Sequence, residues 1–162
     1  MFTRVALAAI FCSGPLFAQD LVFSPTETEI CLHQNPGAES SCIGLSAEQC
    51  MVDTDGGGST VGMGACLDQE LQYWDTRLNA AYQARLAEAK AADKDAKDYG
   101  YTAPPQEENL RAMQRAWIGF RDARCDYARS LWGGGTGGGP AAIGCLMHTT
   151  GEQALYLEQF VR

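Results

Sequence analysis

The residues of this chain best suited to chemistry are its cysteines, and their number and spacing favour disulfides. Six of them follow the first 18 residues, namely Cys31, Cys42, Cys50, Cys66, Cys125 and Cys145. An even number of cysteines in a chain with an export signal is typical of a disulfide framework. A zinc site is the alternative, but it would require close pairs such as Cys-x-x-Cys, which the sequence lacks. His33 and His148 are far apart in the sequence, so we interpret them as surface or capping residues.

The pairing of the cysteines follows from where they fall relative to the helices expected below. Cys31 and Cys42 flank a helical turn, which predicts a Cys31–Cys42 bond. Cys50 ends one expected helix and Cys66 begins the next, which predicts Cys50–Cys66. We expect Cys125–Cys145 because these two cysteines bracket a glycine-rich loop, whose closure should stabilise the fold by about 3 kcal/mol.

A second candidate is a line of polar side chains on the helix expected over residues 107–132. Gln114, Arg121 and Cys125 are seven and four residues apart, which places them close to one line on a helix. Beside it runs an apolar stripe whose face we expect to be buried: Leu110, Met113, Trp117, Phe120, Tyr127 and Leu131. Buried Arg and Gln side chains are usually satisfied by structural hydrogen bonds, so we interpret the line as the edge of a core helix rather than a ligand site.

The helix expected over residues 64–90 has a matching polar line beside its own apolar stripe. The polar line is Asp68, Gln72, Asp75, Asn79 and Gln83, and the stripe is Leu67, Leu71, Trp74, Leu78, Tyr82 and Leu86. If the two long helices pack antiparallel, their polar edges face each other. We therefore predict an ion pair between Asp75 and Arg121, with Gln114 and Asn79 completing the hydrogen bonds.

Sequence patterns for catalysis and for cofactor binding are absent from the chain. It has no Ser-His-Asp arrangement, no zinc-binding helix motif and no haem-attachment Cys-x-x-Cys-His. Gly56, Gly57 and Gly58 suggest a phosphate loop, but no strand precedes them and no Gly-Lys-Ser/Thr follows. We therefore expect a protein that is not an enzyme and that binds no cofactor and no metal.

Hydrophobic periodicity predicts an all-α fold to position these residues. We expect a small disulfide-stabilised bundle of about five to six helices, built on the two long antiparallel ones. The shorter helices cover residues 24–35, 38–52, 140–145 and 149 to the C-terminus, the last opened by a capping box at Thr149 to Glu152. The connections are residues 53–64, a frayed helix end over residues 91–103, and a loop over residues 133–139 with too many glycines for a stable helix.

Residues 1–18 have the pattern of a secretory signal peptide. Arg4 supplies the basic region, residues 5–11 are apolar, and a cleavage site precedes Gln19. This apolar stretch is too short to cross a membrane, and no other stretch is long enough. Residues 19–162 are the size of a single domain. We therefore expect a protein exported to the periplasm or the extracellular space.

The chain is acidic, with 20 Asp and Glu against 12 Lys and Arg and a formal net charge of -8. Such a charge disfavours nucleic acid, because binding to the phosphate backbone depends on Lys and Arg. It favours a basic protein partner, since fields of opposite sign speed encounter.

Several of these residues together resemble the lysozyme inhibitor LprI-like family. The motif residues are Trp74, Asp75, Leu78, Asn79, Tyr82, Gln114, Trp117, Arg121, Asp122 and Thr150, accompanied by Cys66, Cys125 and Cys145. The resemblance covers about residues 64–160. It divides the domain into a family core at residues 64–162 and an N-terminal two-helix extension at residues 19–63. One departure is Gln153, which stands where the family often has an Arg.

The resemblance implies a small exported bacterial helical domain whose motif residues are structural. The family's name implies lysozyme binding, and the acidity suits a basic lysozyme, so we expect a protein-binding domain that inhibits one. An alternative stays open, namely a cell-envelope interaction or stress module that binds another envelope protein, without lysozyme binding or catalysis. Neither the contact surface nor the oligomeric state follows from the sequence.

Overall fold

The computed structural model describes residues 20–160, so the predicted signal peptide at residues 1–18 lies outside the described residues. Those residues form five α-helices, a short 3-10 helix and no strand, which confirms the predicted all-α class. In chain order the elements are α1 (Thr26–Gln34), η1 (Glu39–Cys42), α2 (Leu45–Asp53), α3 (Thr60–Tyr99), α4 (Gln106–Ser130) and α5 (Gly138–Glu158).

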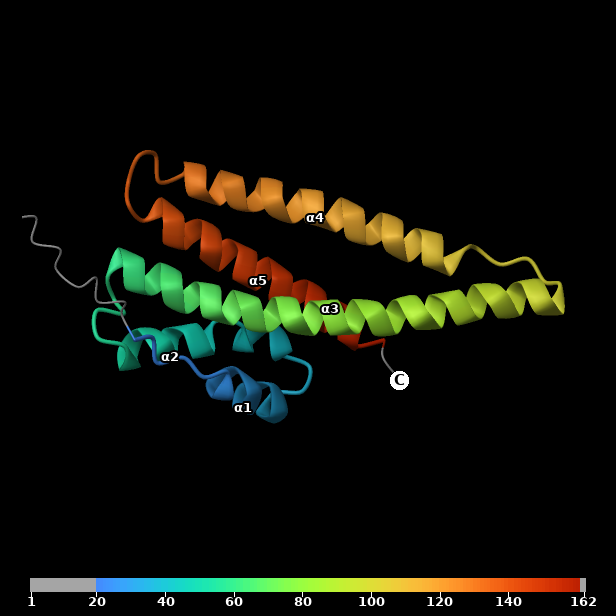
Figure 1. The fold of residues 1–162 in the computed structure, drawn as a ribbon, viewed down its shortest axis with the longest axis horizontal. Helices are drawn as coiled ribbons and strands as arrows, with labels where there is room; N and C mark the ends of the chain where they lie inside the picture. Colours follow the sequence, from blue (N-terminus) through green and yellow to red (C-terminus); the bar gives the residue numbers. More distant parts are fainter. Residues whose placement is uncertain (1–19, 161–162) are drawn as a thin grey trace, which may run out of the picture.

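The bundle is organised around α3, its longest helix (Figure 1). Helix α4 runs back antiparallel to α3, and α5 lies between α4 and the N-terminal half of α3. Helices α1 and α2 pack on the opposite side of α3 from α4. The two long helices are therefore separated by α5 over half of their length.

The core lies where α3 and α5 meet, with η1 and α2 closing it on one side. Its buried members are Ile43, Ala47, Trp74, Leu78, Ala81, Met147, Ala154 and Leu157. Leu110, Met113 and Trp117 of α4 pack against this cluster and are only partly buried. No helix between residues 20 and 160 combines the length and the apolar character needed to cross a membrane.

Helix α3 is longer at both ends than the predicted 64–90. It begins at Thr60, because the side chain of Ser59 accepts a hydrogen bond from the backbone N–H of Gly62 at 3.0 Å and caps the first turn. It continues to Tyr99 and ends at Gly100, whose φ of 69° suits a glycine. The frayed end expected over residues 91–103 is therefore wrong up to Tyr99. Its Ala and Lys residues favour helix, and a Lys94–Asp98 ion pair spans one turn.

The predicted helix over residues 38–52 is two elements in the structure. η1 and α2 are separated at Gly44, whose φ of 106° turns the chain in a way that other residues rarely adopt. This turn points the backbone N–H of Gly44 toward the side chain of Glu70, which is described below.

The two helices predicted after the glycine loop are a single helix, α5, which also includes Gly138 and Gly139. The predicted capping box at Thr149 to Glu152 is wrong, because these residues lie in the middle of α5. Gly151 is buried there and brings α5 against Ile43 and Trp74; an added Cβ would lie 2.8 Å from Ile43 Cδ1. The close packing keeps the helix continuous where the local sequence suggests a start.

Helix α4 buries a narrower face than its apolar stripe predicts. Cys125 is its one buried residue within the described part of the chain, and Trp117 is partly buried. Phe120 is 59% exposed, and Tyr127 and Leu131 are exposed too. α4 packs mainly on α5, so only the side chains nearest α5 are covered.

Candidate functional site

The six cysteines form three disulfides in the pairing expected from their spacing. Cys31–Cys42 joins α1 to η1, Cys50–Cys66 joins α2 to α3, and Cys125–Cys145 joins α4 to α5. Each bond therefore links two elements that are consecutive along the chain. Within the described residues no group of three His, Cys, Asp or Glu side chains could hold a metal ion.

The predicted pair between Asp75 and Arg121 is wrong. Arg121 pairs with its neighbour Asp122, with Nη2 to Oδ1 at 2.8 Å, and lies over the ring of Trp117 at 5.0 Å. Asp75 instead accepts a hydrogen bond from Asn79 at 2.9 Å, within its own helix.

Helix α5 explains this difference, because it lies between α4 and the N-terminal half of α3 (Figure 1). Gln114 of α4 does find a partner, but the partner is Gln153 of α5, whose amide donates to its Oε1 at 3.1 Å. Gln153 is the residue that departs from the family pattern, and it lies buried at the α4–α5 contact.

The other motif residues divide by burial. Trp74, Leu78 and Thr150 are buried, Tyr82 is partly buried, and Asp75, Asn79 and Asp122 are exposed. Most of the motif thus lies in or beside the core rather than around a shared cavity.

Glu70, a fully buried carboxylate on α3, is not among the site residues predicted from the sequence. Its Oε1 accepts hydrogen bonds from Thr28 Oγ1 at 2.9 Å, Gly44 N at 2.7 Å and Trp74 Nε1 at 3.1 Å. Its Oε2 accepts from Ala47 N at 2.7 Å. Two of these donors are backbone N–H groups at the start of α2, where a negative charge also suits the helix dipole. Glu70 therefore fastens the N-terminal segment to α3.

A signal for Glu70 was present in the sequence. Cys66, Glu70, Trp74 and Leu78 follow one another at steps of four, and this line is the buried face of α3. A charged residue in such a line indicates a buried carboxylate with several donors. Glu70 is fully buried and accepts four hydrogen bonds, which is the arrangement of a structural carboxylate.

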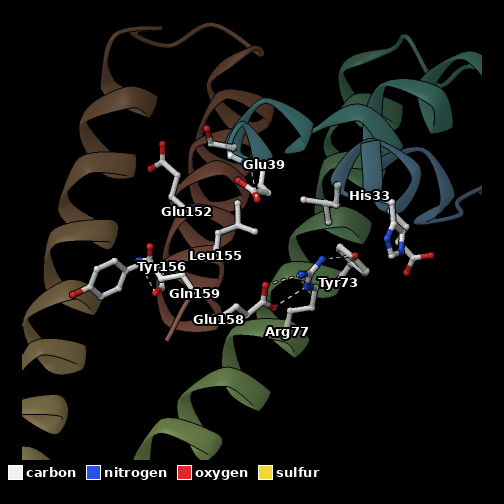
Figure 2. A pocket seen from close by; sticks show the side chains of 13 residues that line it. His33, Glu39, Tyr73, Arg77, Glu152, Leu155, Tyr156, Glu158 and Gln159 are labelled. Atoms are coloured by element: carbon white, nitrogen blue, oxygen red, sulfur yellow. Dashed lines mark hydrogen bonds and ion pairs between the residues drawn. The ribbon is translucent and has the colours of Figure 1, made fainter. Parts of the chain in front are cut away.

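A groove of about 980 Å³ is bounded by α1, η1, α3 and α5 (Figure 2). It is lined by Glu29, Leu32, His33, Gly37, Glu39, Ser40, Tyr73, Arg77, Glu152, Leu155, Tyr156, Glu158 and Gln159. Figure 2 shows Glu39 of η1, and Leu155 of α5 between Glu39 and Glu158. Arg77 reaches from α3 to Glu158 of α5. A groove of this size accommodates several side chains of a partner.

The Arg77–Glu158 ion pair spans the groove. Arg77 Nε and Nη2 donate to the two carboxylate oxygens at 2.9 and 2.6 Å, and Nη1 donates to the Tyr73 hydroxyl at 2.9 Å. The guanidinium also lies 4.9 Å from the ring centre of Trp74. Burial lowers the pKa of Arg77, but the bonds to Glu158 and Tyr73 outweigh it and leave the pKa above its ordinary value. Arg77 is thus a fixed cation, and each of its three nitrogens donates one hydrogen bond.

The remaining carboxylates of the groove are less tightly engaged. Glu39 accepts from the backbone N–H of Gly37 at 2.8 Å, and this bond lowers the pKa of Glu39 below its ordinary value. Glu152 lies 3.5 Å from Arg124, and both side chains are about half exposed. The side chain of Glu29 makes no hydrogen bond or ion pair with a described residue, and it lies near enough to Tyr73 to add to the effect of burial, which raises the pKa of that hydroxyl. The groove is therefore acidic, with four carboxylates against one guanidinium.

Comparisons with known proteins give a family match and two similar relatives. Residues 50–157 match the model of the family described as "Lysozyme inhibitor LprI". An uncharacterized 17.7 kDa protein in the puhA 5' region of Rhodobacter capsulatus is 30% identical over 138 residues, which cover 82% of this chain and 83% of that protein. An uncharacterized protein of Rhizobium meliloti is 31% identical over 103 residues, covering 64% of this chain and 74% of that one. No solved structure matches the chain significantly.

Proposed function

The chain belongs to the lysozyme inhibitor LprI family, and from this membership we propose that it is an exported protein that binds a basic lysozyme and inhibits it. The observation that carries the proposal is the family match over residues 50–157, which spans α3, α4 and nearly all of α5. The same match supports a binding protein rather than a catalyst, because the family is described by inhibition.

Charge supports the choice of a basic lysozyme as the partner. The formal net charge is -8, and an acidic protein attracts a basic one over distances of about 10 Å at 0.1 M salt. A charge of this size raises the association rate without demanding a particular contact. The net charge therefore supports a basic protein as the partner and does not identify the contact surface.

The disulfides support export as the setting. Bonds such as Cys31–Cys42 persist in oxidising compartments and are rare in the reducing cytosol. The periplasm and the extracellular space both meet this condition, and both are places where a bacterium would encounter a lysozyme. The proposal accordingly places the protein outside the cytoplasm.

A lysis assay tests the proposed function. The chain from Gln19 onward would be added to suspended bacterial cell walls together with an animal-type, a goose-type or a phage-type lysozyme. We expect the rate of clearing by at least one basic enzyme to fall in proportion to the complex formed, as measured independently by calorimetry. The same protein, reduced and alkylated, is the control for nonspecific acidity, since it keeps the charge of the carboxylates and loses the three disulfides.

A negative result would be informative as well. If no lysozyme binds at low salt, where attraction between opposite charges is strongest, the inhibitor function is overturned. The alternative of a cell-envelope interaction or stress module would then be favoured.

A further inference from the structure

We propose that the groove between α1, η1, α3 and α5 receives a protruding loop of the partner protein and holds a cationic side chain of that loop, a lysine or an arginine. This inference rests on the proposed function, because it names the contact surface through which a basic protein would be bound.

The carboxylates of the groove come from three different elements. Glu29 lies on α1, Glu39 on η1 and Glu152 on α5, and all three line the same concavity. Such a convergence surrounds an entering cation with acceptors from several directions, whereas carboxylates along one exposed helix would meet it from one side only. The geometry points to a ligand with positive charge at its tip.

The one guanidinium of the groove does not neutralise these carboxylates. All three nitrogens of Arg77 already donate, two to Glu158 and one to Tyr73. To reach Glu29 or Glu39, Arg77 would have to break a bidentate ion pair, which is the strong kind. Glu29 and Glu39 thus stay available to a cation from outside, and Glu152 holds only a half-exposed contact with Arg124 at 3.5 Å.

The walls of the groove suit the rest of a lysine or arginine side chain. Leu32 and Leu155 offer apolar surface, and Tyr73 and Tyr156 offer aromatic rings. The aliphatic stems of Lys and Arg pack on such surface while their charged ends reach polar groups, and a cation is attracted to an aromatic face. An anionic ligand fits poorly, because it would meet the carboxylates and find Arg77 already paired with Glu158.

Two of the carboxylates that line the groove lie outside the segment that matches the family. Glu29 and Glu39 precede residue 50, where the matched segment begins, while Glu152 and Arg77 lie within it. The groove is therefore completed by the N-terminal segment, which Glu70 and the Cys31–Cys42 disulfide hold in place.

Two variants of equal charge test this contact. The groove variant carries Glu29→Gln, Glu39→Gln and Glu152→Gln. The control variant carries Asp95→Asn, Glu108→Gln and Asp126→Asn, which are exposed residues outside the groove. Both remove three negative charges, so both should slow association with the lysozyme by a similar factor. We expect the groove variant alone to dissociate faster, which would weaken its affinity at least about tenfold more than that of the control.

Equal affinities of the two variants, within about twofold, would overturn the groove as the contact while leaving lysozyme binding intact. Circular dichroism and thermal unfolding would check that each variant folds. Glu29→Gln alone is the fallback if the triple variant does not fold, because the Glu29 side chain has no hydrogen bond or ion pair with a described residue to lose.

A small probe separates failure of the groove from failure of the proposed function. The peptide acetyl-Gly-Arg-Gly-amide, added at millimolar concentration, should shift the amide NMR signals of Gly37, Glu39 and Gln159 in the wild-type chain and not in the groove variant. The matched peptide acetyl-Gly-Glu-Gly-amide should leave them unchanged. Arginine-peptide binding without lysozyme binding would uphold the groove and reject the lysozyme; absence of both would overturn both.

Discussion

Among single residues, the Arg77–Glu158 ion pair makes the clearest energetic prediction. Each side chain is a little under one-third exposed, so water screens the pair only in part, and the contact is bidentate. In a double-mutant cycle with Arg77→Gln and Glu158→Gln, we expect a coupling of about 1–2 kcal/mol, above the usual value for an exposed pair. Urea denaturation of the four chains measures it.

The matched control for that cycle is Asp75 with Arg121, the pair that the sequence suggested. Asp75→Asn and Arg121→Gln should be additive within about 0.5 kcal/mol, because each side chain bonds elsewhere, to Asn79 and to Asp122. Coupling in this control, or its absence between Arg77 and Glu158, would contradict the structure.

Glu70 makes a second prediction at this scale. Glu70→Gln replaces one carboxylate oxygen by an NH2 group, so a donor would face the donors of Gly44 and Thr28 or of Ala47. Because the site is fully buried, we expect a loss of about 3 kcal/mol or more in the free energy of unfolding. Glu48→Gln on the exposed side of α2 is the control and should change it by less than about 0.5 kcal/mol. A loss below about 1 kcal/mol for Glu70→Gln would show that water reaches the carboxylate.

These residues also show how far side-chain pairing could be predicted. The disulfides were predictable because the short connections between the elements keep the two cysteines of each pair close in sequence. The Asp75–Arg121 pair was not, because its position depends on which helix lies between α3 and α4, and periodicity identifies faces without identifying neighbours. The groove is harder still, since Glu29, Glu39 and Glu152 meet only after three elements have packed.

At the scale of elements, Gly→Ala substitutions inside helices distinguish the effect of core packing on stability from the effect of helix propensity. Gly151→Ala in α5 would place a Cβ 2.8 Å from Ile43 and 3.1 Å from Trp74, so either these side chains or the helix must shift. Gly119→Ala in α4 meets nothing within 4 Å. We expect Gly151→Ala to destabilise by about 1–3 kcal/mol and Gly119→Ala to stabilise by up to about 1 kcal/mol. Thermal or chemical unfolding of both variants measures the contrast, and stabilisation by both would mean that α5 does not pack so closely.

The Cys125–Cys145 bond fixes α4 to α5 across the glycine loop. Replacing both cysteines by Ala reopens a 20-residue connection in the unfolded chain, and we expect a loss of about 3 kcal/mol. The free energy of unfolding of this variant is compared with that of the wild-type protein, both measured in denaturant without reductant. A loss below about 1 kcal/mol would indicate that α4 is held by packing, despite its narrow buried face.

Helix boundaries were less predictable from the sequence than helix number and type. α3 and α4 carry long periodic stripes, so their existence followed directly from the pattern. The break expected inside α5 did not occur, because Gly151 and its neighbours look like a helix start locally and gain burial only in the folded chain. The continuation of α3 through Asp93 has a similar cause: both carboxylate oxygens of Asp93 accept N–H groups at the start of α4, from Gln106 and Glu107.

At the scale of the whole molecule, the proposed function makes net charge the property that would guide the encounter with a basic lysozyme. The formal net charge of -8 acts before any contact forms, whereas the groove acts only after contact. The two effects therefore belong to different rate constants. Charges far from the groove, such as Asp95 or Asp126, contribute to association without entering the contact.

Salt should affect the association rate and the dissociation rate to different extents. Raising the ionic strength from 0.01 M to 0.15 M shortens the screening length from about 30 Å to about 8 Å. We expect the association rate with a basic lysozyme to fall about tenfold or more over this range, and the dissociation rate to change much less. Stopped-flow or surface binding at several salt concentrations measures both. The variant with Asp95→Asn, Glu108→Gln and Asp126→Asn should show a shallower salt dependence of association. An association rate independent of salt, or a salt effect confined to dissociation, would mean that charge does not guide the encounter.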